Sequence, residues 1–290
     1  ADSRPTPAPR LLSCIPPSQT TPPTPPPEAA SVTLAIDGNL RFEGPQIALY
    51  ESCPRRFFYT HILKIGGRRK ASAFMQMHEA VRSVFQAILE GNVSPPAAEQ
   101  LEDRIADAFV EHGLDEHGYA DDYKAFALNM LQYFVSSREG STSEPPTALS
   151  LTFGDEQIVV KPDDILVRSD GSRTLRRVLT GHRRSSEGKD VGAAAFMLAT
   201  QQAFPDAVVE LVHLSDKSTK PLTMSSNMLQ NRNKKLATYL DEIRRGRFPK
   251  ASSPRVCPGC PAFFVCGPTP PGTLRKKFEK NLPVADSRSD

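Results

Sequence analysis

The sequence predicts an α/β domain in which helices come first, short strands follow in the middle and helices return towards the end. Three observations support this prediction. Apolar residues recur at helical spacing between 71 and 137, and β-prone runs separated by turn residues fill 148–179. Helical periodicity then returns after 189. With 290 residues, of which 39% are hydrophobic, the chain can bury one substantial core.

The two ends of the chain differ in composition from the middle. The first 30 residues contain ten prolines with Ser and Thr between them, and too few large apolar groups to offset the entropy lost on ordering. We therefore predict a disordered Pro-rich linker over 1–42, one domain over 43–268 and a basic flexible tail over 269–290. Because the chain begins with Ala, we expect it to be a fragment of a longer protein.

The first half of the domain is predicted to be helical. Pro54 follows Cys53 directly and suits the first turn of a helix, where its missing N–H is not needed. Helices are also predicted over 96–112 and 119–137. A longer helix is predicted over 71–90, since its apolar residues repeat with helical periodicity at Phe74, Met77, Val81, Val84, Phe85 and Ile88.

The second half mixes strands and helices. Pro162 and the turn at 169–172 separate β-prone runs, which predict strands over 148–153, 157–160, 164–168 and 175–179. A further strand is predicted over 207–214, between helices at 189–203 and 225–246.

Charge and hydropathy exclude several classes of protein. The formal net charge of +3 permits nucleic-acid binding without requiring it. No apolar run approaches the length of a membrane span, and the N-terminus lacks a signal-peptide pattern. Five cysteines, one of them Cys14 in the predicted linker, do not form an even disulfide set. We therefore expect a cytoplasmic protein.

Four of the cysteines have the spacing of a metal centre. Cys257, Cys260 and Cys266 form a C-x2-C-x5-C cluster, and Cys53 lies about 200 residues upstream. Four thiolates suit a tetrahedral zinc ion or a cubane iron–sulfur cluster, and either would connect the two ends of the domain. The alternative is a zinc knuckle at the C-terminal cluster, with Cys53 an ordinary buried thiol.

The segment ALYESCPRRFFYTHILKI (48–65) resembles the opening of the RecB/AddB-type nuclease domain, a branch of the PD-(D/E)xK superfamily found in DNA-repair helicase–nucleases. In the iron–sulfur members of that branch, one cysteine precedes Pro-Arg-(Arg/Lys)-Phe-aromatic, and three more close the domain as C-x2-C-x5-C or similar. The resemblance covers roughly 43–268.

The resemblance implies a restriction-endonuclease-like fold, with a central mixed sheet flanked by helices and an N-terminal helical insertion. It also implies that the four cysteines hold a [4Fe–4S] cluster, with zinc as the alternative. The partners it implies are DNA and a helicase, either as a subunit or as a domain of the same longer chain, in a bacterial-type, nucleoid-associated setting.

The resemblance also points to two residues of a divalent-metal site. His78 occupies the position of a ligand on the early helix, and Asp164 matches an acid on one hairpin strand, with Asp163 as its alternate. A buried, hydrogen-bonded histidine and a turn acid after Pro162 are the structural alternatives for these positions.

The next element departs from the family pattern. Where the family has a strand ending in Asp-x-Lys-Thr-Gly, this chain has LRRVLTG, so Arg177 stands at the acidic position and Leu179 at the lysine. Neither side chain can replace the residue it stands for, because Mg²⁺ needs oxygen ligands and leucine carries no charge. A lysine moved to Lys161, or to Lys189 beside Glu187, could restore the pair.

Three interpretations of function follow. The first is a catalytically degenerate nuclease-like domain that binds DNA phosphates through Arg177, Arg183 and Arg184. The second is an active, Mg²⁺-dependent DNA exonuclease or endonuclease with a displaced lysine. The third is a zinc-stapled protein-interaction domain.

Overall fold

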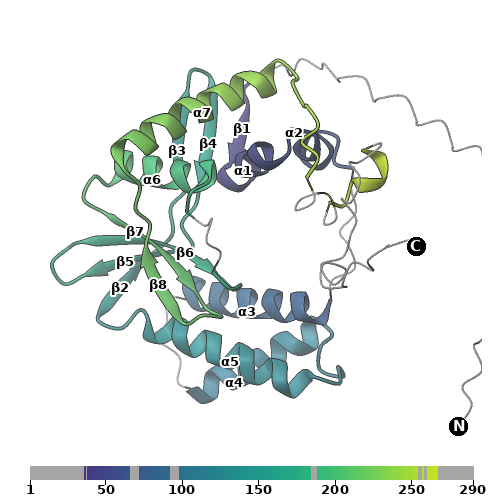
Figure 1. Cartoon of the computed structure of the whole chain (residues 1–290). Coiled ribbons are helices and arrows are strands. Elements are labelled where there is room, and N and C mark those ends of the chain that lie inside the picture. Colours follow the sequence, from purple (N-terminus) through teal and green to yellow (C-terminus); the bar gives the residue numbers. More distant parts are fainter. Residues whose placement is uncertain are drawn as a thin grey trace, which may run out of the picture.

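The computed structural model describes residues 36, 38–65, 72–91, 98–183, 188–253, 257 and 260–266, which form a mixed α/β fold (Figure 1). Most of the predicted linker and all of the predicted tail lie outside these residues. The first strand, β1 (Arg41–Glu43), begins inside the segment 1–42 that composition assigned to the linker.

Three helices form the early helical part. These are α3 (Ala73–Glu90), α4 (Ala98–Glu111) and α5 (Ala120–Ser136), which pack on one another at one side of the molecule (Figure 1). The Ser72 hydroxyl caps α3 by accepting a hydrogen bond from the Met75 N–H at 3.3 Å.

A five-stranded mixed sheet lies next to these helices (Figure 1), with strand order β2-β5-β6-β7-β8. The β6–β7 pair is parallel and the other pairs are antiparallel, and Asp164 lies opposite Arg176 in the β5–β6 register. The strands are β2 (Ser141–Glu144), β5 (Asp164–Arg168), β6 (Arg173–Leu179), β7 (Val208–His213) and β8 (Ser218–Pro221).

A second layer contains a three-stranded sheet in the order β1-β4-β3 and the remaining helices. The strands are β3 (Leu149–Phe153) and β4 (Glu156–Val160), together with β1. The helices are α1 (Gly44–Ser52), α2 (Pro54–Phe57), the π-helical turn η3 (Phe58–Ile62), α6 (Val191–Ala203), α7 (Ser226–Arg244) and the 3₁₀ turn η5 (Phe263–Val265).

Two hydrophobic cores lie on opposite faces of the five-stranded sheet. Leu175 of β6 packs into the core beneath α1, α6 and α7, whereas Val178 packs against α3, α4 and α5. Because alternate residues of a strand point to opposite faces, this division fixes the direction of every side chain between them. Arg177 therefore shares a face with Leu175, and Arg176 shares one with Val178.

Helices α1 and α6 cross very closely. A Cβ atom added to Gly192 would lie 3.1 Å from the Gly44 carbonyl oxygen and 3.2 Å from the Ala48 Cβ. A larger side chain would separate the helices, so glycine is needed for this approach. The crossing brings the start of α6 beside the end of β4 and the turn that follows it.

The two ends of the domain are joined by hydrogen bonds. The buried Arg55 donates from Nε to the Phe248 carbonyl oxygen at 2.8 Å, and the Tyr50 hydroxyl donates to the Arg247 carbonyl oxygen at 2.7 Å. The first arginine of the Pro54-Arg55-Arg56 motif therefore fastens the start of the domain to the segment after α7.

Candidate functional site

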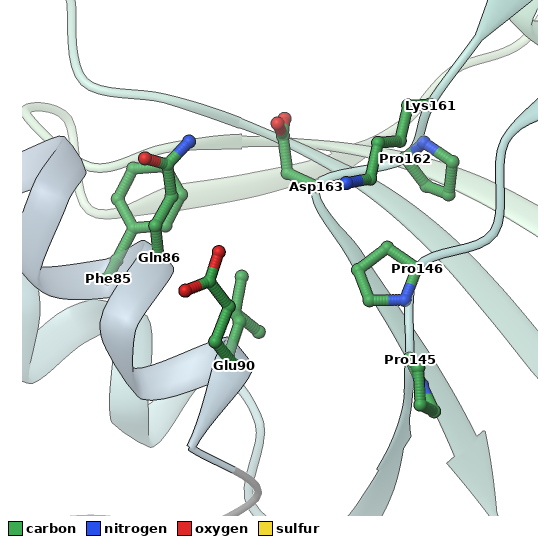
Figure 2. Close-up of a pocket in the computed structure, with 9 residues that line it drawn as sticks. Phe85, Gln86, Glu90, Pro145, Pro146, Lys161, Pro162 and Asp163 are labelled. Atoms are coloured by element: carbon green, nitrogen blue, oxygen red, sulfur yellow. The ribbon is translucent and has the colours of Figure 1, made fainter.

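Two cavities adjoin where the turn between β4 and β5 meets α3. The first cavity has a volume of about 330 Å³ and is called the arginine cavity. Five charged side chains contribute to its lining, namely Glu43, Arg82, Lys161, Asp163 and Arg177. The second, about 300 Å³, is called the proline cavity and is shown in Figure 2; Pro145, Pro146 and Pro162 contribute to its lining. Lys161 and Asp163 line both cavities.

Asp163 is held at the site by the backbone of β6. Its N–H donates to the Arg176 carbonyl oxygen at 2.9 Å, and its Oδ2 accepts from the Val178 N–H at 2.8 Å. Burial raises the pKa of this carboxyl above its ordinary value, although the Val178 N–H and the charges of Arg177 and Arg82 act in the opposite direction. The position of its carboxylate is thus fixed in spite of a desolvation cost.

Asp164 points to the opposite face of the sheet. Its side chain is fully buried, and its Oδ2 lies 3.1 Å from Arg176 Nη1 and 3.2 Å from Arg138 Nε. The Ser143 hydroxyl donates to the other oxygen at 3.2 Å. The structure therefore places Asp164, the predicted strand acid, in an internal ion cluster outside both cavities, and it places the alternate Asp163 in both.

Arg177 lies on the same face as Asp163 and lines the arginine cavity with it. Leu179, two residues further along β6, shares that face and is partly buried. Both residues predicted to replace the Asp-x-Lys pair therefore lie on the Asp163 side of the strand.

One row of α3 runs alongside the cavities. His78, Arg82, Gln86 and Glu90 are each one turn apart; Arg82 lines the arginine cavity, and Gln86 and Glu90 line the proline cavity. His78 is partly buried, with its ring centroid 4.4 Å from that of Phe74. Burial and the positive charges of His182 and Arg82 lower the pKa of His78. His78 thus lies one turn from Arg82 without lining either cavity.

The four predicted cysteine ligands line one small pocket. Cys53, Cys257 and Cys260 are buried, Cys266 is partly buried, and within the described part of the chain none of them forms a disulfide. Burial raises the pKa of the Cys266 thiol, Lys250 lowers it, and the neighbouring Cys53 and Cys260 thiols raise it further. The fold therefore brings together side chains that are about 200 residues apart in sequence.

The comparisons with known proteins identify the family. The family model described as the PD-(D/E)XK nuclease superfamily matches residues 45–267, well over half of the chain. The chain belongs to the PD-(D/E)XK nuclease superfamily. The comparison with curated protein sequences gave no significant match.

Among solved structures, this superfamily member is similar to a chain titled "Crystal structure of SSO0001". The sequence identity is 9% and the TM-score 0.39, and the match covers 80% of this chain and 87% of the other.

The charges around the arginine cavity do not suit the divalent ion that the resemblance implies for a nuclease of this superfamily. Among the described residues, three cationic side chains and two carboxylates line the cavity, so its lining has one net positive charge. No group of three or more His, Cys, Asp or Glu side chains in the described ranges is arranged to hold a metal ion. The absence of such a group extends to the cysteine pocket. Its four thiols are nevertheless the soft donors that zinc and iron–sulfur clusters prefer.

The other predicted phosphate-binding arginines lie just beyond β6. Asp216 accepts from His182 Nδ1 and from the Arg183 N–H, both at 2.6 Å, and so fixes the backbone at the exposed Arg183. Arg184 lies outside the described residues, as does Glu187, whereas Lys189 is described and exposed.

Sequence reasoning missed two of the charged residues of the arginine cavity. Arg82 follows His78 by four residues, which is a signal that a helical projection could have used. Glu43 carried no such signal, because it enters the site through the pairing of β1 with β4, in which it lies opposite Val159.

No helix among the described residues has both the length and the apolar character that a membrane crossing requires.

Proposed function

We propose that this domain is a degenerate superfamily member that binds DNA phosphate in the arginine cavity and does not cleave it. One observation carries the proposal: Arg177, at the position where the resemblance expects a metal-binding acid, lines the same cavity as Asp163. A guanidinium there repels a divalent cation and attracts a phosphate oxygen.

The other cations of the cavity support the same function. Arg82 approaches from α3 and Lys161 from the β4–β5 turn, and both are exposed. Three cationic groups from separate elements can surround one phosphate, whereas Asp163 and Glu43 limit the net charge. Contacts of this kind act on the nucleic-acid backbone and give salt-dependent binding with little sequence preference.

The test is a binding titration with labelled DNA at several salt concentrations. We expect Arg177→Ala combined with Lys161→Ala to weaken binding and to reduce the slope of log K against log salt by about 0.7–0.9 for each lost phosphate contact. Arg245→Ala is the control, because Arg245 is exposed on the surface in an ion pair with Asp241. An equal loss of DNA affinity in the control and in the double variant would refute a phosphate site at this cavity.

A second candidate function is Mg²⁺-dependent DNA cleavage with a displaced lysine. Its support is that Lys161 and Asp163 line the same cavities, so an acid and a lysine do meet, although not on one strand. Mg²⁺-dependent digestion that disappears in Lys161→Ala would favour this function over the first.

For the cysteine pocket we propose a [4Fe–4S] cluster held by Cys53, Cys257, Cys260 and Cys266, with zinc as the alternative. Support comes from the four thiols in one pocket, a soft donor set that suits such a cluster. Anaerobic purification followed by metal analysis distinguishes the two. Stoichiometric zinc without iron would instead support a zinc-stapled interaction domain.

We further propose that the domain serves DNA repair or recombination beside a helicase, as the resemblance implies, in a cytoplasmic, nucleoid-associated setting. The basic cavity and the superfamily membership support a nucleic-acid partner. Co-purification of a tagged chain from nuclease-treated cells tests the helicase partner, because a contact mediated only by DNA is lost under that treatment.

A further inference from the structure

The proline cavity has two apolar sides. Phe85 and Leu89 of α3 line one side, and Pro145 and Pro146, from the segment between β2 and β3, line the other. Figure 2 shows Phe85 and the two prolines separated by open space. Apolar side chains on both sides of a cavity favour a ligand with two apolar faces.

Polar groups occupy the same cavity. Gln86 and Glu90 project from α3, and Figure 2 shows the Glu90 carboxylate directed into the space between the helix and Pro146. Their amide and carboxylate groups offer hydrogen-bond donors and acceptors to one edge of a ligand. A volume of about 300 Å³ is at the lower end of the range for small-molecule sites, which suits a group of the size of a nucleoside.

The proline cavity adjoins the arginine cavity, because Lys161 and Asp163 line both. A ligand that fills both cavities has a flat, hydrogen-bonding part and an anionic part next to it. A nucleotide within a nucleic-acid strand has this combination, with its base in the proline cavity and its phosphate beside Arg177.

We propose that the proline cavity is a subsite for one unpaired nucleobase, with Glu90 and Gln86 reading its polar edge. The proposal rests on the proposed phosphate-binding function and adds a substrate class to it, namely nucleic acid with an unstacked base.

The chemistry of Glu90 predicts which bases bind. An ionised carboxylate only accepts hydrogen bonds, so it favours the exocyclic amino group of cytosine. Thymine offers it only N3–H, which lies between two carbonyl oxygens that repel the carboxylate. The Gln86 amide can donate to a ring nitrogen or carbonyl of the same base. We therefore expect preference for oligo-dC over oligo-dT at equal length.

The test compares the binding of three labelled single strands of equal length to the full chain: oligo-dC, oligo-dT and an abasic strand. We expect oligo-dC to bind about tenfold more tightly than oligo-dT. Glu90→Ala should abolish this preference. Glu79→Ala is the matched control, because it removes the same charge from the same helix. Glu79 is exposed and lines neither cavity.

A second variant tests the cavity itself. Leu89→Trp should fill the space and weaken oligo-dC binding while leaving the abasic strand unaffected, with an unchanged melting temperature showing that the fold is intact. Equal binding of all three strands by the unaltered protein, or a preference that survives Glu90→Ala, would overturn the subsite. If Arg177→Ala still weakens binding in that case, the phosphate site stands, whereas no binding of any strand at low salt overturns both proposals.

Discussion

The Asp163 carboxylate accepts a hydrogen bond at 2.8 Å from the backbone N–H of Val178, the residue that follows Arg177 in β6. This bond fixes Asp163 beside β6, the strand in which the proposed alignment puts Arg177 and Leu179 where the family has an acid and a lysine. Asp163 and Arg177, an acid and a guanidinium, therefore line one cavity.

The first prediction is that the protein does not digest DNA with Mg²⁺ or Mn²⁺. Removal of one preorganised stabilising group typically lowers the rate about 10²–10³-fold, and under the proposed alignment β6 lacks two. Arg177→Asp combined with Leu179→Lys places both groups on the Asp163 face and should produce activity that EDTA abolishes. Digestion by the unaltered protein that depends on Lys189 would mean that this strand is misaligned with the family pattern.

The second prediction concerns the internal ion cluster. Arg176→Ala leaves the buried Asp164 with Arg138 alone as its cationic partner, and we expect the free energy of unfolding to fall by about 3 kcal/mol. Urea denaturation measures this change. Arg173→Ala is the control, because Arg173 pairs with Glu144 at the surface and should change stability little. Equal effects of the two substitutions would contradict a structural role for Asp164.

The third prediction concerns pH and Glu51. Burial alone raises the pKa of this carboxyl, but the Lys235 ammonium, the Val191 N–H and Arg232 outweigh burial and hold the pKa below its ordinary value. The ionised form is therefore favoured in the folded state. Its stabilisation is fully present above the ordinary pKa and is lost as pH falls through the lowered one.

Glu51→Gln should accordingly lower the free energy of unfolding near neutral pH by roughly 1–3 kcal/mol and flatten its decrease towards acid. Melting curves between neutral and acidic pH measure both effects. Asp241→Asn, which alters an exposed pair on α7, should leave the pH profile unchanged. A profile for Glu51→Gln that parallels the unaltered protein would contradict the assignment.

The fourth prediction concerns the cysteine pocket. If the proposed cluster is present, the purified protein should be brown and contain about four iron atoms per chain. Cys257→Ala should lose the iron and melt at a lower temperature, because metal binding contributes to folding. Cys14→Ala is the matched control in the predicted linker. Equal iron content and melting temperature in both variants would show that Cys257 is not a ligand.

The long elements could be predicted from sequence because their patterns are strong. The helix predicted over 71–90 is α3, and the four β-prone runs are β3 to β6. The strands β1, β2 and β8 could not, because Arg-Phe-Glu, Ser-Thr-Ser-Glu and Ser-Thr-Lys-Pro lack apolar alternation. These strands form only because neighbouring strands supply their hydrogen bonds.

The site was predictable only in part. The sequence presents Asp164 as the candidate strand acid with Asp163 as its alternate, and only the register with β6 determines which of them enters the cavity. A shift of one residue reverses the face of a strand side chain, and sequence alone does not reveal it. Glu43 is brought in by the parallel pairing of β1 with β4, which the sequence alone does not reveal either.

The measurement that tests the central claim most directly is the DNA affinity of Asp163→Asn at low salt, with and without Mg²⁺. Asparagine can still accept the Val178 hydrogen bond while removing one negative charge from the arginine cavity. If the cavity binds phosphate, the variant should bind DNA several-fold more tightly, and Mg²⁺ should not be required. Loss of a Mg²⁺-dependent binding or cleavage activity in Asp163→Asn would contradict the account and identify the cavity as a metal centre.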